Sequence, residues 1–310
     1  DGLQEKIRAV GLALGRLQQA EELARMVAAD LALARRAITI TGPRPRVGFL
    51  HNIGRSTPLA GGRNTPAEAM IGFAGGGNAF DRFEADPEMR VAVLTGAGTG
   101  SFCSGGDLEL TLPLLSGARV PETEWDRRLA ADREVLFRST LKGAQGTKPV
   151  IAAINGHCLA GGFELMLATD IRIAADHARF GLPEARHALI PFAGALVRLP
   201  RQLPHAVAME LLLTGDQVEA GRLLALGLLN RVLPGDEVMP AAMAMAERIA
   251  ANGPLAIAEI KRATAESLGR PLGEGFAIET ESMDRVMSSD DAREGPRAFM
   301  ERRVPVYTGT

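Results

Sequence analysis

The sequence is poor in the residues that build metal centres and base-stacking surfaces. It has 310 residues but only two cysteines and five histidines, and none of them stands in a CxxC or HxxxH pattern. This scarcity argues against a metal site. Aromatic residues make up 4% of the chain, too few for a surface that stacks nucleic-acid bases. We therefore expect no metal and no nucleic-acid partner.

The chain also lacks a strong net charge and a long apolar run. Its formal net charge is −2, which favours neither nucleic acid nor an anionic membrane as a partner. No apolar run approaches the roughly 20 residues that a membrane helix needs. Cys103 and Cys158 lie in apolar, glycine-flanked segments. We expect buried free thiols in a reducing, cytoplasmic compartment, and a disulfide between them is the less favoured alternative.

Residues 1–77 form the least regular part of the sequence. Apolar residues at helical spacing, such as Ile7, Val10 and Leu14, predict an amphipathic helix within the first 40 residues. The following stretch is rich in glycine and proline, with one candidate short strand at Val47–Leu50. We expect an atypical N-terminal segment that ends near residue 77.

From residue 78 the pattern becomes that of an α/β protein. Val91–Thr95, Val150–Ile154 and Ile171–Ala175 are short apolar runs, which favour buried strands of a largely parallel sheet. Helices are expected over Glu124–Lys142 and from a capping box at Asp216, with Glu219 three residues on, to Gly227. The predicted core spans residues 78–235.

Beyond Val232–Leu233 the pattern becomes helical. The expected helices cover four segments: one ending at Asn252, Pro254–Leu268, Gly273–Ser288 and a last turn around Arg297–Arg303. Strand–helix alternation followed by helices predicts an α/β core with a C-terminal helical subdomain, residues 236–310.

The stretch from Val150 to Asp170 carries the chemistry. A buried strand ends at Asn155, a turn follows at Gly161–Gly162, and a helix then begins. The first amides of a helix have no intrahelical partner and can bind an anionic oxygen. Glu164 lies directly beyond them. An acid beside an anion hole favours proton transfer on a carbonyl compound over phosphate binding.

Plain structural interpretations compete with the catalytic ones. Glu164 can be a first-turn acid that interacts with the helix dipole, and Glu184 a loop residue. Gly106 and Gly161 can be simple turn glycines, and Asp107 a helix cap. The neighbours His157 and Cys158 do not form a nucleophilic pair, because adjacent strand residues point to opposite faces.

Several long motifs in sequence order carry a resemblance to a known family. They are VAVLTGAGTGSFCSGGDL, KPVIAAINGHCLAGGFELMLATDIRIAADHARFGLPE, AMELLLTGD…GLLNRV and the C-terminal DAREG…FMERRVPVYTG. Over about Asn78 to Thr310 the chain resembles the crotonase superfamily, the enoyl-CoA hydratase/isomerase family, and most of all an enoyl-CoA hydratase.

The resemblance implies a fold, an assembly and a substrate. The fold is a spiral of ββα units with C-terminal trimerisation helices, and the assembly is a homotrimer or a dimer of trimers. The substrate is an acyl-CoA thioester, and coenzyme A enters only as part of it, so no separate cofactor is expected.

The resemblance also assigns roles to residues. The amides of Gly106 and Gly161 hold the thioester oxygen, Glu164 orients and deprotonates water, and Glu184 donates the α-proton. The residues implied to contact the CoA substrate are Ser104, Gly106, Asp107, Leu108 and Gly161.

The N-terminal segment departs from the family pattern. The usual Asn-Arg-Pro and Asn-Ala signals have only faint counterparts at Arg63–Pro66 and Asn78–Ala79. The segment is either an unrelated replacement or a frame-shifted reading of the gene. Two functional alternatives also stay open: an isomerase or carnitinyl-CoA-type dehydratase of the same fold, and a non-catalytic RNA-binding or interaction homologue.

Overall fold

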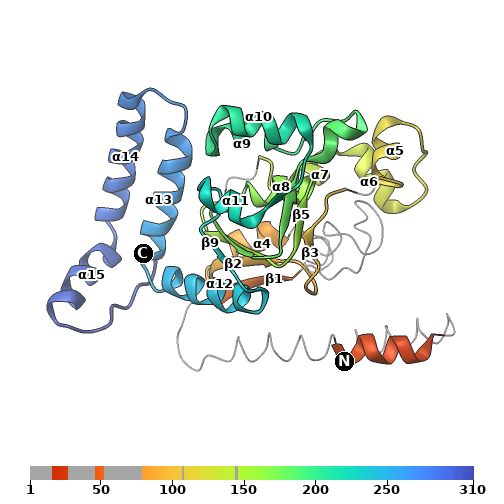
Figure 1. The fold of residues 1–310 in the computed structure, drawn as a ribbon. Coiled ribbons are helices and arrows are strands. Elements are labelled where there is room, and N and C mark those ends of the chain that lie inside the picture. The colour runs from red at the N-terminus through yellow and green to blue at the C-terminus, as the bar shows by residue number, and fades with distance from the viewer. Residues whose placement is uncertain (1–15, 27–45, 52–78, 107, 144–145) are drawn as a thin grey trace. The chain divides into compact units, whose positions relative to one another are not determined.

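The computed structural model describes residues 16–26, 46–51, 79–106, 108–143 and 146–310 (Figure 1). The chain divides into two units, residues 1–46 and 47–310. In the first unit, residues 17–26 are helical, as the periodicity predicts. The rest of the expected N-terminal helix and the glycine-rich stretch up to residue 78 lie outside the described residues. The predicted domain boundaries at 77 and 235 stay predictions.

The second unit alternates strands and helices and then becomes helical (Figure 1). Its strands are β1 (Arg46–His51), β2 (Met89–Thr95), β3 (Ser101–Cys103), β4 (Val150–Ile154), β5 (His157–Leu159), β6 (Ile171–Ala175), β7 (Arg179–Gly181), β8 (Val218–Glu219) and β9 (Arg231–Leu233). The helices up to β9 are α4 (Ala79–Ala85), α5 (Thr111–Ser116), α6 (Glu124–Ala131), α7 (Glu134–Ser139), α8 (Gly161–Met166), the 3₁₀ turn η1 (Pro183–His187), α9 (Ala195–Gln202), α10 (His205–Thr214) and α11 (Ala220–Ala225). The C-terminal helices are α12 (Gly235–Ala250), α13 (Pro254–Ser267), α14 (Leu272–Met287) and α15 (Asp290–Met300).

In the described part of the chain the strands form two sheets. A five-stranded sheet has the order β1-β2-β4-β6-β9, and a four-stranded sheet has the order β3-β5-β7-β8. Consecutive strands alternate between the sheets: β2 is followed by β3, β4 by β5, and β6 by β7. The pairs β2/β4, β4/β6 and β6/β9 are parallel, as are β3/β5 and β5/β7. The chain therefore advances as a repeating strand–strand–helix unit.

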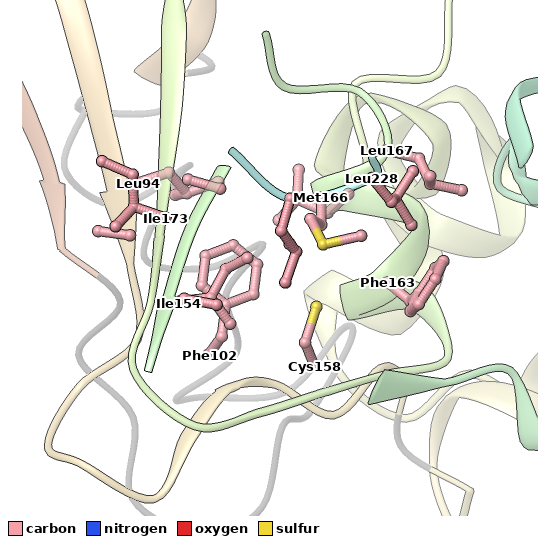
Figure 2. Close-up of a cluster of buried hydrophobic side chains, with 14 of the residues drawn as sticks. Leu94, Phe102, Ile154, Cys158, Phe163, Met166, Leu167, Ile173 and Leu228 are labelled. Carbon is pink, nitrogen blue, oxygen red and sulfur yellow. The ribbon is translucent and has the colours of Figure 1, made fainter. Parts of the chain in front are cut away.

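The central strands of the first sheet, β2, β4 and β6, are buried on both faces, as their continuous apolar runs predict. All five residues of β4 are buried, and so are the last five of β2. The apolar face of α12 packs against β2, β4 and β6 through Val238, Ala242 and Ala246. Figure 2 shows the core that links the strands to α8, where the side chains of Phe102, Cys158 and Met166 gather.

Two helix predictions in the core are wrong. The expected helix Glu124–Lys142 is broken at Asp132, which is extended (φ −140°, ψ 100°) and whose carboxylate caps the amide of Glu134 at 2.9 Å. The expected capping box at Asp216 and Glu219 does not form. Val218 and Glu219 instead pair with β7 as a short strand, and α11 begins only at Ala220.

The helical C-terminal part is confirmed, and its last helix begins earlier than predicted. α15 starts at Asp290, where Ser289 caps the amide of Ala292 at 3.1 Å. The sequence patterns missed α9 altogether, because Pro200 lies inside it. No helix among the described residues combines the length and apolarity that crossing a membrane requires.

Candidate active site

Three neighbouring strands of the second sheet bring three turns together. β5 lies between β3 and β7 and is parallel to both, so the carboxyl ends of the three strands share one edge. β3 leads into Ser104–Gly106, β5 into Gly161 and α8, and β7 into η1. The amide of Ala160 donates to the carbonyl oxygen of Gly181 at 2.9 Å, which joins the second turn to the third. Residues about 80 positions apart in the sequence therefore meet at one place.

Close backbone approach joins the first two turns. A Cβ at Gly162 would lie 2.0 Å from the carbonyl oxygen of Cys103, so only glycine lets the start of α8 pack on the end of β3. Gly105 has φ +97°, and a Cβ there would lie 2.7 Å from Cβ of Ala160 and 3.0 Å from the amide nitrogen of Gly161. Both glycines are structural requirements of the contact.

The amides of Gly106 and Gly161 lie on this contact. A Cβ at Gly161 would lie 3.9 Å from the amide nitrogen of Gly106, which places the two turns side by side. Within the described residues, neither amide donates a hydrogen bond to a protein acceptor. Gly161 is the first residue of α8, where the helix dipole favours negative charge. The two predicted donors therefore lie close together and are free to bind an oxygen atom.

Glu164 is the buried acid of the site. It stands in the first turn of α8, its side chain is 3% exposed, and its Oε1 accepts a hydrogen bond from the amide of Ala195 at 3.0 Å. Burial, and to a smaller extent the charge of Glu184, raises the pKa of Glu164 from 4.5 to about 7. The amide of Ala195 opposes this rise because it stabilises the ionised form. Glu164 is thus poised to change protonation state near neutral pH.

Glu184 is the second acid and lies in η1, where only a loop was expected. It is half-buried, and burial raises its pKa above the ordinary range. Among the residues that the structure describes, its Oε2 is the buried side-chain oxygen without a hydrogen-bond partner. A buried polar atom without a partner costs roughly 1–3 kcal/mol, so such an atom calls for an explanation. The effect of its charge on Glu164 places the two acids within electrostatic reach of each other.

The remaining predicted residues surround this centre. Ser104 and Leu108 are exposed on either side of Gly106, and Asp107 lies outside the described residues. Cys158 is buried whereas His157 is exposed, so the two do not form a nucleophilic pair, as predicted. Cys103 stands opposite Cys158 across β3 and β5, and both are free thiols.

The patterns did not reveal Ala195, whose amide binds Glu164. A backbone donor leaves no side-chain signature, and the one hint is Gly194, which has φ +129° and precedes the first residue of α9. Lys142 and Arg198 were also missed, although both lie close enough to interact electrostatically with Glu164. Neither residue lies in the motifs that suggest an oxyanion hole or a catalytic acid, so the sequence offers no reason to select it.

Fold and site together define an α/β protein with two acids beside a pair of free backbone amides. The family model described as enoyl-CoA hydratase/isomerase matches residues 75–310. The enoyl-CoA hydratase EchA19 of Mycobacterium tuberculosis is 42% identical over 230 residues, which cover 74% of this chain and 83% of the relative. The carnitinyl-CoA dehydratase of Proteus mirabilis is 40% identical over 240 residues, covering 75% and 87%. The chain therefore belongs to the enoyl-CoA hydratase/isomerase family, within the crotonase superfamily.

Solved structures confirm the predicted fold class. The crystal structure of an enoyl-CoA hydratase from M. tuberculosis matches with a TM-score of 0.70 and 37% identity, covering 86% of this chain and 97% of that one. An enoyl-CoA hydratase from Polaromonas gives a TM-score of 0.72 at 32% identity, covering 86% and 98%. The spiral α/β core and the C-terminal helices are thus those of the family.

Proposed function

We propose that this chain is an enoyl-CoA hydratase, which adds water across the 2,3 double bond of an enoyl-CoA thioester or removes it in reverse. The observation that supports the proposal is that the turn with Gly106, the helix start with Gly161 and Glu164, and the turn with Glu184 follow three adjacent parallel strands of the second sheet. Family membership supports an acyl-CoA substrate, because the relatives at about 40% identity are named for reactions of CoA thioesters.

The proposed chemistry divides between the hole and the acids. When water attacks the β-carbon, negative charge develops on the thioester oxygen, and the amides of Gly106 and Gly161 stabilise it. One such donor is typically worth about 2.7–4 kcal/mol in the transition state. Ser104, Asp107 and Leu108 follow or flank Gly106 and are assigned to contact the CoA substrate. Coenzyme A is part of the substrate, and the mechanism calls for no separate cofactor.

Burial raises the pKa of both acids, so we assign their roles from their hydrogen bonds. Glu164 accepts a hydrogen bond from an amide, which favours its ionised form, so we assign it to orient and deprotonate water. Among the described residues, Oε2 of Glu184 has no donor that would stabilise its ionised form, so we assign Glu184 to carry the proton that reaches the α-carbon. A pair of acids in unlike surroundings is the usual arrangement for acid–base work.

The test is hydration of crotonyl-CoA, followed by the loss of its enoyl absorbance. We expect turnover with ordinary enzymatic rates, of about 1–10³ s⁻¹. Absence of turnover with crotonyl-CoA and with longer 2-enoyl thioesters would overturn the assignment.

A dehydratase acting on a carnitinyl thioester is the second candidate, and the 40% identity to the P. mirabilis protein favours it. In this second proposal Glu164 and Glu184 would remove water instead of adding it. Comparing kcat/KM for carnitinyl-CoA and for 3-hydroxybutyryl-CoA separates the two.

An isomerase would shift the double bond of a 3-enoyl-CoA without incorporating oxygen from labelled water. The paired acids argue for water chemistry, because isomerases of this family often work with one.

A non-catalytic RNA-binding or interaction homologue is the alternative of another class. The near-neutral charge and the assembled acid pair argue against it. Salt-dependent RNA retention without thioester turnover would favour it.

We further propose that the chain assembles as a homotrimer or a dimer of trimers through its C-terminal helices, and that it works in the cytoplasm. The assembly would cover exposed apolar side chains on α14 and α15, namely Leu272, Phe276, Met283, Met287, Phe299 and Met300. Free thiols at both cysteines support a reducing compartment.

A further inference from the structure

The donor that meets Glu164 belongs to the N-terminus of α9. Gly194 precedes the helix with φ +129°, a conformation that turns the chain so that the amide of Ala195 points at Oε1 of Glu164. The neighbouring amide of Ala193 also lowers the pKa of this carboxyl group. The backbone of residues 193–195 therefore faces the carboxylate, and its placement decides how well the ionised form is stabilised.

Two cations fasten this stretch of backbone to the turn after α7. Lys142 lies in that turn, and its Nζ donates to the carbonyl oxygen of Phe192 at 2.7 Å. Arg198 lies one turn into α9 and reaches back, where its Nη2 donates to the carbonyl oxygen of Leu141 at 2.7 Å. Its Nη1 also donates to the carbonyl oxygen of Thr140 at 3.5 Å. The contacts are reciprocal, since each segment supplies one cation and one or more carbonyl acceptors.

Further contacts fix the two cations in place. The ammonium group of Lys142 lies 4.0 Å from the ring centroid of Phe137 in α7, a cation–π contact. Leu141, whose carbonyl oxygen accepts from Arg198, has φ +53° and a buried side chain. Packing of this side chain and the hydrogen bond from Arg198 therefore both hold the turn. Arg198 is half-buried. Because both cations bind backbone carbonyl oxygens and Arg198 is half-buried, we expect these contacts to hold the backbone more firmly than an exposed surface ion pair would.

We propose that Lys142 and Arg198 are positioning residues for Glu164: by joining residues 140–142 to 192–198, they hold the N-terminal amides of α9 against the carboxylate that activates water. The inference rests on the proposed hydratase function for its catalytic consequence. The contact between the amide of Ala195 and Glu164 does not depend on that function, so the two can fail separately.

The charges that face Glu164 come from three elements. Glu184 of η1 raises the pKa of Glu164, and Lys142, after α7, lowers it. Arg198 of α9 also interacts with its charge. Loss of either cation therefore removes a favourable charge and loosens the amide donors. Both effects disfavour the ionised carboxylate.

The experiment compares Lys142→Met and Arg198→Met with Arg138→Met and Arg201→Met. The controls remove exposed cations that lie next to the two segments, in α7 and at the end of α9. The first measurement is the pH dependence of kcat/KM for crotonyl-CoA. We expect the acidic limb to move up by about half a pH unit or more in the two test variants, KM to stay within about twofold, and the controls to match the wild type. Lys142→Arg should restore the wild-type profile.

The second measurement does not need turnover. The carboxyl carbon of Glu164 is titrated by ¹³C NMR and identified by the loss of its signal in Glu164→Gln. Its midpoint should rise in both test variants. An unchanged midpoint, with activity lowered equally at all pH values, would mean a merely structural role and overturn the inference. A wild type without hydratase activity would sink the proposed function alone, because the titration still decides the positioning role. Should Lys142→Met not fold, Lys142→Gln is titrated in its place.

Discussion

The central strands of the α/β core and the C-terminal helix α14 differ in how far their apolar side chains are exposed. Every residue of β4 is buried, and α12 covers the sheet with one apolar face. In α14, by contrast, Ser282 is the buried residue, whereas Leu272 and Phe276 are 77% and 60% exposed. The core completes itself within one chain. The last helices present exposed apolar side chains, which we propose that a second copy of the chain covers.

This contrast separates two kinds of consequence. Changes in the core should alter the placement of acids and amides, and hence the chemistry. Changes on the exposed apolar face of α14 should alter assembly and leave each active site intact, since the groups that form the site come from the turn after β3, from α8, η1 and the start of α9. The following substitutions test where that separation holds.

The largest effect is expected from removing an acid. Glu164→Gln keeps the shape and the contact with the amide of Ala195 but cannot accept a proton from water. We expect kcat for crotonyl-CoA to fall by about 10²–10⁴-fold, and Glu184→Gln to do the same. Glu237→Gln, an exposed acid at the start of α12, is the control and should keep full activity. Full activity in both test variants would refute the assigned roles.

The next effect comes from one methyl group in the glycine turns. Gly105→Ala adds a Cβ that would lie 2.7 Å from that of Ala160, at a φ of +97° that alanine rarely adopts. We expect the amides of the hole to separate and kcat to fall by about 10²-fold. Gly100→Ala is the matched control, because its Cβ would meet no atom within 4 Å. Equal activity in the two variants would mean that the contact between the turns does not shape the site.

These two predictions also show what the sequence could reveal. The long apolar runs of β2, β4 and β6 predict the first sheet, because strands with four or five buried residues leave a clear signal. The second sheet consists of strands of only two or three residues, too short for any periodicity. Yet that sheet aligns the turns at Gly105, Gly161 and Glu184. The candidate residues could be named from motifs, whereas the reason they meet could not.

Competition between local signals explains the wrong helix boundaries. Asp132 stands in a helical pattern, but its carboxylate caps Glu134 and starts a new helix instead. Asp216 is spaced as a helix cap, but it forms an ion pair with Arg186 of η1. Both outcomes depend on tertiary neighbours, which a single sequence does not contain.

A smaller effect concerns stability. Burial raises the pKa of Glu164 from 4.5 to about 7, so its ionised form weakens the fold above neutral pH. The stability that protonation provides is complete below pH 4.5 and is lost as the pH rises through about 7. Glu164→Gln should therefore unfold with a free energy about 2–3 kcal/mol higher than the wild type at pH 8. Urea unfolding at several pH values should show this gain shrinking between pH 7 and 4.5. A gain independent of pH would contradict the buried ionised acid.

The smallest effect on chemistry is expected from the exposed face of α14. Phe276→Glu and Met287→Glu place charges where we propose that a second copy packs, and charge is strongly disfavoured at the centre of an interface. Sedimentation should show the mass falling toward that of one chain, while Glu279→Gln, an exposed polar position of the same helix, keeps the assembly. Activity per chain should change less than about threefold, because α14 supplies none of the proposed catalytic groups. Were activity to collapse together with the assembly, the second copy would be part of the active site, and the separation between core and C-terminal helices would fail.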